Sequence, residues 1–158
     1  MYLSYVYWNE HEPKPGFYDF NGQNDIFLFI DMANKTGLNV IFRAGPYVCG
    51  EHDFGGLPWW LLSDGTNKIR LRSREARYMK AVTKWFQVLL PKLWPYLIKN
   101  GGPVMMVQVE NEYGSYFECD HVYMGQLRDL FRKYLGDDTV LFTTGNFLNC
   151  LICYFANI

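Results

Sequence analysis

The sequence predicts an α/β fold with a parallel sheet, and three observations support this. Short runs of β-branched, aliphatic and aromatic residues alternate with longer segments whose apolar residues recur at helical spacing. Four such strands alternate with three such helices, which is the pattern of a parallel sheet with right-handed crossovers. Polar and aromatic segments follow the strands, so reactive side chains are expected at the carboxyl ends of the strands.

The first strand and the first helix are predicted near the beginning of the chain. Residues 3–8 are β-branched and aromatic and predict a strand, and the polar residues 9–16, with two prolines, predict a loop. A helix is expected from about 23 to 36, because its apolar residues form a stripe at helical spacing. Asn21 can cap this helix, and Gly37 ends it.

The middle of the chain predicts a second strand, a binding loop and a second helix. Residues 38–43 are expected to form a buried strand. Residues 44–60 are rich in glycine, proline and aromatic side chains and too polar for a core, so they predict a binding loop. The second helix is expected to begin near a Ser73 cap, and Pro91 is expected to end or kink it.

Two further strands flank a third helix. Residues 104–109 form a continuous apolar run, typical of a parallel strand covered on both faces, and they lead directly into residues 110–112. A helix is expected near 121–135 and a fourth strand at 140–144. No glycine-rich phosphate fingerprint follows a strand, which disfavours a nucleotide-binding fold.

The composition favours a small neutral ligand. The 15 basic and 16 acidic residues nearly cancel, so neither nucleic acid nor an anionic membrane is an expected partner. No window approaches the roughly 18 consecutive apolar residues of a membrane span, and the first residues predict a strand rather than a signal peptide. Aromatic residues make up 18% of the chain, many beside polar residues, which is typical of sugar sites, although surplus aromatic residues also fill cores.

Glu110, Asn111 and Glu112 are the strongest candidates for chemistry. Charged side chains at the end of a buried apolar strand are costly unless they are paired, hydrogen-bonded or functional. The alternative is a strand end that surfaces into solvent. In a regular strand Asn111 and Glu112 point to opposite faces, so both reach one site only if the strand bulges or ends there.

Several motifs resemble one enzyme family in the same order along the chain. The run 107–116, Val-Gln-Val-Glu-Asn-Glu-Tyr-Gly-Ser-Tyr, resembles the acid/base segment of the family 35 glycoside hydrolases, the β-galactosidases. The likeness covers roughly residues 2–144 and is strongest to the lysosomal and secreted animal members. Its other segments are Tyr5-Val6-Tyr7-Trp8-Asn9, His11-Glu12-Pro13, Gly45-Pro46-Tyr47-Val48-Cys49, Gly55-Gly56-Leu57-Pro58 and Leu141-Phe142-Thr143-Thr144.

The resemblance implies a fold and an activity. The family fold is a (β/α)8 TIM barrel, and residues 1–158 would form a partial catalytic barrel, truncated at both ends, with about four of the eight βα units (family strands two to five). The implied reaction is retaining hydrolysis of terminal β-galactose from glycans and glycoconjugates, with neither cofactor nor metal. A lysosomal or extracellular location is implied for the full-length relative, for which a homo-oligomer is also compatible.

The resemblance also implies site residues, position by position. Glu112 matches the proton donor, the acid/base of the reaction. Tyr5, Glu51 and Asn111 match residues that contact the galactose. The nucleophilic carboxylate is expected beyond the end of the chain and not at Glu110, so the isolated chain is expected to be inactive. Taken singly, Tyr5 could equally be a core residue and Glu51 a solvated loop charge.

The sequence departs from the family beside the expected site. Gly50 replaces the alanine that usually precedes Glu51, and His52-Asp53-Phe54 replaces a segment that contains tryptophan. The contact surface after the second strand is therefore expected to differ. Cys150 lies in a segment whose cysteine pairs, in the family, with the one that matches Cys119, so a Cys119–Cys150 disulfide is implied.

Three hypotheses follow. The first is the acid/base half of a β-galactosidase. The second is a galactose-binding fragment or module that uses Tyr5, Glu51 and Asn111 without catalysis. The third is a thiol or zinc protein built on Cys150 and Cys153, which the histidine spacing does not support.

Overall fold

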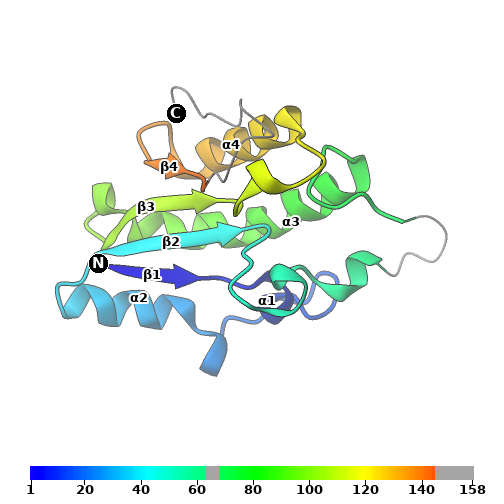
Figure 1. Cartoon of the computed structure of the whole chain (residues 1–158). Helices are drawn as coiled ribbons and strands as arrows, with labels where there is room; N and C mark the ends of the chain where they lie inside the picture. The colour runs from blue at the N-terminus through cyan, green and yellow to red at the C-terminus, as the bar shows by residue number, and fades with distance from the viewer. Residues whose placement is uncertain (63–67, 145–158) are drawn as a thin grey trace.

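The structure, a computed structural model, describes residues 1–62 and 68–144. Its sheet has four parallel strands in the order in which they occur in the chain (Figure 1). The strands are β1 (Tyr2–Tyr5), β2 (Val40–Gly45), β3 (Val104–Val109) and β4 (Leu141–Phe142). A helical segment joins each strand to the next, so the predicted α/β fold with a parallel sheet is confirmed.

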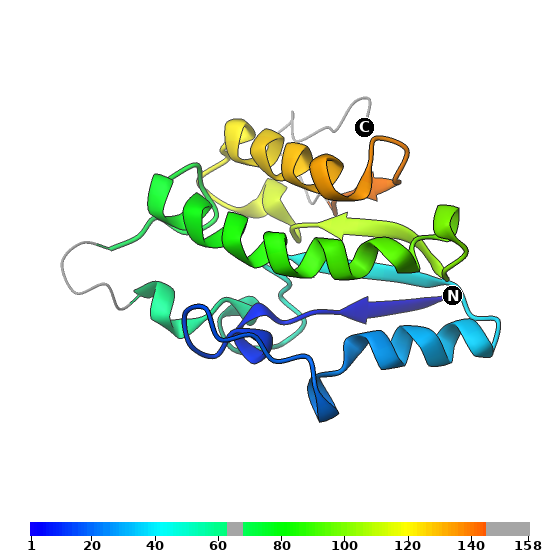
Figure 2. The ribbon, with the colours of Figure 1, turned by 180° about the vertical axis from the view of Figure 1, so that it is seen from behind.

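Three long helices cover one side of this sheet. They are α2 (Ile26–Lys35), α3 (Ala76–Leu93) and α4 (His121–Leu135), seen in front of and beside the strands in Figure 2. No helix of the described residues lies over the opposite face, which is turned to the viewer in Figure 1. Consecutive parallel strands with their helices on one side form part of a (β/α)8 barrel, so the predicted partial barrel of about four units is confirmed.

Side chains alternate between the two faces of the sheet. Phe42 pairs in register with Val107, and both are buried on the helix side. Their neighbours Arg43 and Gln108 pair with each other on the open side, and Tyr5 pairs with Arg43 in the same row. A polar row therefore crosses the open face near the carboxyl ends of three strands.

The first predicted strand is too long. β1 ends at Tyr5, and Trp8 begins the short helix α1 (Trp8–His11), which lies inside the segment predicted as a loop. The Trp8 ring is fully buried and stacks 6.0 Å from the ring of Trp85 in α3, and this contact requires the chain to turn after β1. β4 is likewise shorter than the predicted strand at 140–144. The 3-10 turns are Gly22–Asn24, Asp53–Gly56, Trp59–Leu62, Trp94–Tyr96, Ile98–Asn100 and Tyr113–Ser115.

Both predicted helix caps are wrong by a few residues. The side chain of Asp25, not that of Asn21, caps α2, and its Oδ1 accepts a hydrogen bond from Leu28 N at 2.8 Å. At α3 the side chain of Glu75 accepts the first hydrogen bond. Ser73 Oγ donates instead to a backbone oxygen of the preceding turn. Local polar residues compete for each cap, and the sequence alone does not decide between them.

Pro91 does not end α3, as the sequence had suggested it could. The helix continues to Leu93 because Pro91 lies in its last turn, where the missing N–H removes one hydrogen bond only. Leu89, Leu90 and Leu93 are all fully buried around it, and their packing outweighs that loss.

His11 makes the stability of this packing depend on pH. Its ring is buried, stacks 4.8 Å from Phe20 and donates through Nδ1 to Asp19 O at 2.9 Å. Burial lowers the pKa of His11 below its ordinary value of 6.5. The unfolded chain therefore binds this proton more readily than the folded chain as pH falls below 6.5, and the free energy of unfolding decreases.

We expect the melting temperature to fall between pH 7.5 and pH 5.5, and to fall less in His11→Gln, which cannot take up the proton. Thermal unfolding followed by circular dichroism at both pH values measures this. His121→Gln removes an exposed histidine and is the matched control. An equal fall in wild type and His11→Gln would contradict the role of His11.

Candidate active site

The chain leaves β3 through two residues in the left-handed region. β3 ends at Val109, and Glu110 and Glu112 have φ values of 61° and 49°. Side chains other than glycine seldom adopt this conformation, which costs about 1–3 kcal/mol at each residue. The predicted end of the strand at this point is confirmed, and the strain indicates that surrounding contacts hold the segment in place.

A chain of contacts crosses the open face of the sheet. The guanidinium carbon of Arg43 lies 4.6 Å above the centre of the Tyr5 ring. Arg43 Nε donates to Gln108 Oε1 at 3.0 Å, and Gln108 Nε2 donates to Asn111 Oδ1 at 3.0 Å. Tyr5 and Asn111, which were predicted from the sequence, are therefore joined through two residues that were not.

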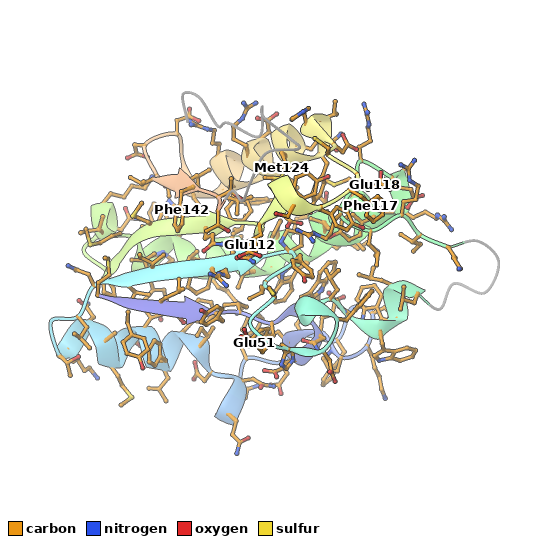
Figure 3. All side chains as sticks on the ribbon, in the orientation of Figure 1. Glu51, Glu112, Phe117, Glu118, Met124 and Phe142 are labelled. Carbon is orange, nitrogen blue, oxygen red and sulfur yellow. The ribbon has the colours of Figure 1, made fainter. Side chains whose placement is uncertain are left out.

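Asn111 and Glu112 are held by Thr144, which follows β4. Thr144 Oγ1 donates to Asn111 Oδ1 at 3.2 Å and accepts from Glu112 N at 3.0 Å. Because Asn111 Oδ1 accepts two hydrogen bonds, the NH2 group is the end of this amide that donates. The Glu112 side chain is exposed, at the end of β3 (Figure 3).

Glu51 is exposed in the loop that follows β2 (Figure 3). Its loop is joined to Tyr5 through Tyr7, whose hydroxyl donates to Gly50 O at 3.3 Å and whose ring stacks 6.2 Å from the Tyr5 ring. A Cβ on Gly50 would lie 2.5 Å from Tyr7 Oη, so an alanine would collide with this hydroxyl. The glycine at position 50 therefore leaves room for the Tyr7 hydroxyl.

His52 forms the rest of this surface. Its ring stacks 4.1 Å from the Tyr7 ring, and its Nε2 lies 3.3 Å from Glu10 Oε1. Burial, followed by the charges of Tyr5 and Glu10, raises the pKa of Tyr7. Tyrosine and histidine rings thus form the surface next to the loop that carries Glu51.

Glu110 does not belong to the open surface. It is 0% exposed, and its carboxylate accepts hydrogen bonds from Arg72 Nη2 at 2.8 Å and from Tyr123 Oη at 2.6 Å. Burial and the Glu110 charge raise the pKa of Tyr123 well above its ordinary value, so its hydroxyl remains a donor. For Glu110 the alternative of a strand end surfacing into solvent is wrong.

Arg43, Gln108 and Arg72 are the residues that the sequence analysis missed. Arg43 and Gln108 stand within runs assigned as buried strands, and a polar side chain in such a run is itself a signal, because its burial is costly without a partner. Arg72 gives no local signal. It could be sought only as the cation that a buried Glu110 requires.

The structure shows the state of two cysteines, one of which belongs to the predicted disulfide. Cys119 is disulfide-bonded, and Cys49 is free. Cys150 and Cys153 lie outside the described residues, so the Cys119–Cys150 pairing stays a prediction. Within residues 1–62 and 68–144 no group of three His, Cys, Asp or Glu side chains could hold a metal ion. No helix in the described part of the chain is long and apolar enough to cross a membrane.

Comparison of the sequence with known protein families tests the resemblance inferred from the motifs. The family model for glycosyl hydrolases family 35 matches residues 2–153. The chain belongs to this family. The family 35 resemblance inferred from the motifs is thus confirmed.

Beta-galactosidases from mammals are similar to this chain over most of its length. The dog enzyme (Canis lupus familiaris) is 53% identical over 151 residues, and the human enzyme (Homo sapiens) is 54% identical over 151 residues. The mouse enzyme (Mus musculus) is 56% identical over 140 residues. The alignments cover 93%, 93% and 89% of this chain. The chain spans only 22%, 22% and 21% of the length of these relatives.

Two solved structures resemble the fold at low sequence identity. The exo-beta-1,4-mannosidase Op5Man5 from Opitutaceae bacterium strain TAV5 superimposes with a TM-score of 0.65 at 18% identity, over 85% of this chain and 23% of that chain. Endo-glycoceramidase II from Rhodococcus sp. gives a TM-score of 0.58 at 13% identity, over 88% of this chain and 39% of that chain. These similarities show the fold alone.

Proposed function

We propose that this chain carries the acid/base half of a retaining β-galactosidase site, with Glu112 as the proton donor. The observation that carries the proposal is an exposed carboxyl group at the end of β3, directly after Asn111, in a member of family 35. Barrel enzymes place their reactive groups at the carboxyl ends of strands. The mammalian relatives named beta-galactosidase support galactose as the sugar.

The chemistry needs two carboxyl groups with different roles. Protonated Glu112 gives its proton to the glycosidic oxygen while a second carboxylate, roughly 5 Å away, attacks the anomeric carbon. Glu112, now ionised, then takes a proton from the water that hydrolyses the galactosyl intermediate. Glu110 is buried against Arg72 and does not face a substrate, so it is not assigned as the second carboxylate.

The other predicted residues bind the sugar. The NH2 group of Asn111 donates to a hydroxyl beside the scissile bond, because its oxygen is occupied by Gln108 and Thr144. Tyr5, which is 37% exposed, offers its ring to the pyranose, and the Glu51 carboxylate accepts from galactose hydroxyls. The proposal extends to terminal β-galactose on glycans and glycoconjugates as substrate, and to a lysosomal or extracellular role in carbohydrate metabolism.

Glu112→Gln in the intact protein tests this function. With β-galactosides of graded leaving-group acidity, we expect kcat to fall about 10²–10⁴-fold for a poor leaving group, since the amide cannot donate the proton. The rate of bond cleavage for a dinitrophenyl galactoside should change little, because that group leaves without protonation. Azide should then accelerate turnover and yield galactosyl azide, since it attacks without a general base.

Glu118→Gln is the matched control, because Glu118 lies on the following loop and pairs with Arg70. In Glu118→Gln, the dependence of kcat on leaving-group acidity should equal that of the wild type. Activity of Glu112→Gln that equals the wild type on poor leaving groups would remove Glu112 from the reaction.

A galactose-binding module without catalysis is the second candidate, favoured by the contacts that join Tyr5 to Asn111 across the open face of the sheet, since these need no second carboxylate. Isothermal titration calorimetry of the 158-residue chain with galactose tests it. Binding that is lost in Asn111→Ala, in a protein with no turnover in its intact form, would favour this second function.

A further inference from the structure

Arg72 contacts the segment that leads to the proposed proton donor, although it lies 40 residues earlier in the chain. Its Nη2 donates to Glu110 Oε2 at 2.8 Å and also to Asn111 O at 2.8 Å. Its Nε lies 3.2 Å from the same carboxylate oxygen. One guanidinium group therefore contacts the two residues that immediately precede Glu112.

Three strained residues meet in this cluster. Arg72, Glu110 and Glu112 have φ values of 50°, 61° and 49°, all in the left-handed region. Such residues persist only where their surroundings enforce the conformation. Glu110 Oε2 also accepts from Asn111 N at 3.0 Å, so the carboxylate holds the peptide group before Asn111 and the guanidinium holds the one after it.

Arg72 is itself fixed from several sides. Its guanidinium carbon lies 3.8 Å from the centre of the Tyr47 ring and 4.3 Å from that of Tyr116. Its backbone oxygen accepts from Tyr113 Oη at 2.8 Å. Arg72 is only 7% exposed, and Glu110 is 0% exposed, so neither reaches the open surface.

We propose that Arg72, through its ion pair with Glu110, is a positioning residue that holds the backbone of Asn111, and through it Glu112, in the orientation needed for proton transfer. This rests on the proposed function of Glu112. Arg72 acts through the backbone of residues 110–112 and does not touch the substrate. The buried pair therefore has a role beyond stability.

An arginine is needed because the contacts are directional. The planar fork donates to a carboxylate and to a carbonyl at once, whereas a lysine at this position supplies a point charge on a flexible stem. Burial on its own lowers the pKa of Arg72, but the Glu110 charge and hydrogen bonds outweigh it and raise the pKa, so the charge is retained. Arg72→Lys therefore keeps the positive charge but loses the hydrogen bond that the guanidinium donates to Asn111 O.

Arg72→Lys in the intact protein, assayed beside Glu112→Gln, tests the proposal. We expect kcat on a β-galactoside with a poor leaving group to fall by up to about 100-fold, the effect of a displacement of about 1 Å of a reacting group. KM should change little, because the Asn111 amide keeps its hydrogen bonds to Gln108 and Thr144. A dinitrophenyl galactoside should be cleaved at nearly the wild-type rate, because its leaving group needs no proton. Azide should increase turnover, as it does when the general base is misplaced.

Arg70→Lys is the matched control, because Arg70 is exposed, lies two residues away and pairs with Glu118 instead. It should keep the wild-type rate on both substrates. Tyr123→Phe removes one hydrogen bond to Glu110 while keeping the ring, and it should show the same substrate dependence with a smaller loss. This variant tests the proposal even if Arg72→Lys does not fold.

A loss of equal size on both substrates in Arg72→Lys and Tyr123→Phe would overturn the proposal, because it would reflect only the fraction of folded enzyme. If Glu112→Gln shows the leaving-group dependence and these two variants do not, the positioning role fails and the proposed function stands. If Glu112→Gln itself lacks the dependence, the proposed function fails first.

Discussion

Replacing Trp85 by alanine is expected to lower the free energy of unfolding by about 3–5 kcal/mol, the range for deleting a large buried aromatic side chain. Trp85 is fully buried in α3, and four rings lie around it. Their centres are 6.0 Å (Trp8), 6.0 Å (His11), 6.3 Å (Tyr18) and 6.1 Å (Phe20) from its own. The cavity would therefore loosen the whole segment after β1 from α3.

Chemical denaturation of the intact protein measures this loss. Trp94→Ala, at a tryptophan that is 45% exposed, is the matched control and should change the free energy by no more than about 0.5 kcal/mol. Trp85→Phe should lose much less than Trp85→Ala. Trp85 Nε1 has no hydrogen-bond partner among the described residues, and phenylalanine removes this buried donor while filling most of the space. Equal losses in the two tryptophan-to-alanine variants would contradict the central place of Trp85.

The same contacts explain which elements the sequence predicts well. The bounds predicted for β3 and α4, 104–109 and 121–135, are those observed, because each is a long run with its own periodicity and clear ends. α1 was missed because the residue that turns the chain there is Trp8, whose partner lies 77 positions away in α3. Contacts between distant segments decided this element, and local propensity could not.

The candidate site also combines residues that a local motif predicts with residues that distant segments supply. Asn111 and Glu112 were identified from a contiguous motif. The structure places them after the end of β3, with Asn111 joined to Tyr5 through Gln108 and Arg43. The residues that hold them come from other segments. Arg43 lies on the neighbouring strand, and Arg72 precedes α3. Arg43 stands out in the sequence only as a polar residue within an apolar run, and Arg72 gives no local signal, so their contacts with the motif are revealed by the folded chain.

Glu110→Leu is expected to lower the free energy of unfolding by about 3–5 kcal/mol, because it leaves the Arg72 guanidinium buried without its counter-charge. Arg72 would keep only its contacts with Asn111 O and with the flanking tyrosine rings. Tyr123 would also lose the acceptor of its buried hydroxyl. Thermal and chemical unfolding of the intact protein measure the loss.

The double variant Glu110→Leu, Arg72→Met separates stability from positioning. Replacing both members of a buried ion pair by apolar residues of similar size is often neutral, so the double variant should recover most of the stability that Glu110→Leu loses. It cannot recover the hydrogen bonds to Asn111, so its activity on poor leaving groups should stay low while its melting temperature returns toward that of the wild type. A double variant as unstable as Glu110→Leu would mean that the unpaired charge does not explain the lost free energy of unfolding. The loss would then come from strain at residues 110–112, where two left-handed residues need the guanidinium to hold their backbone.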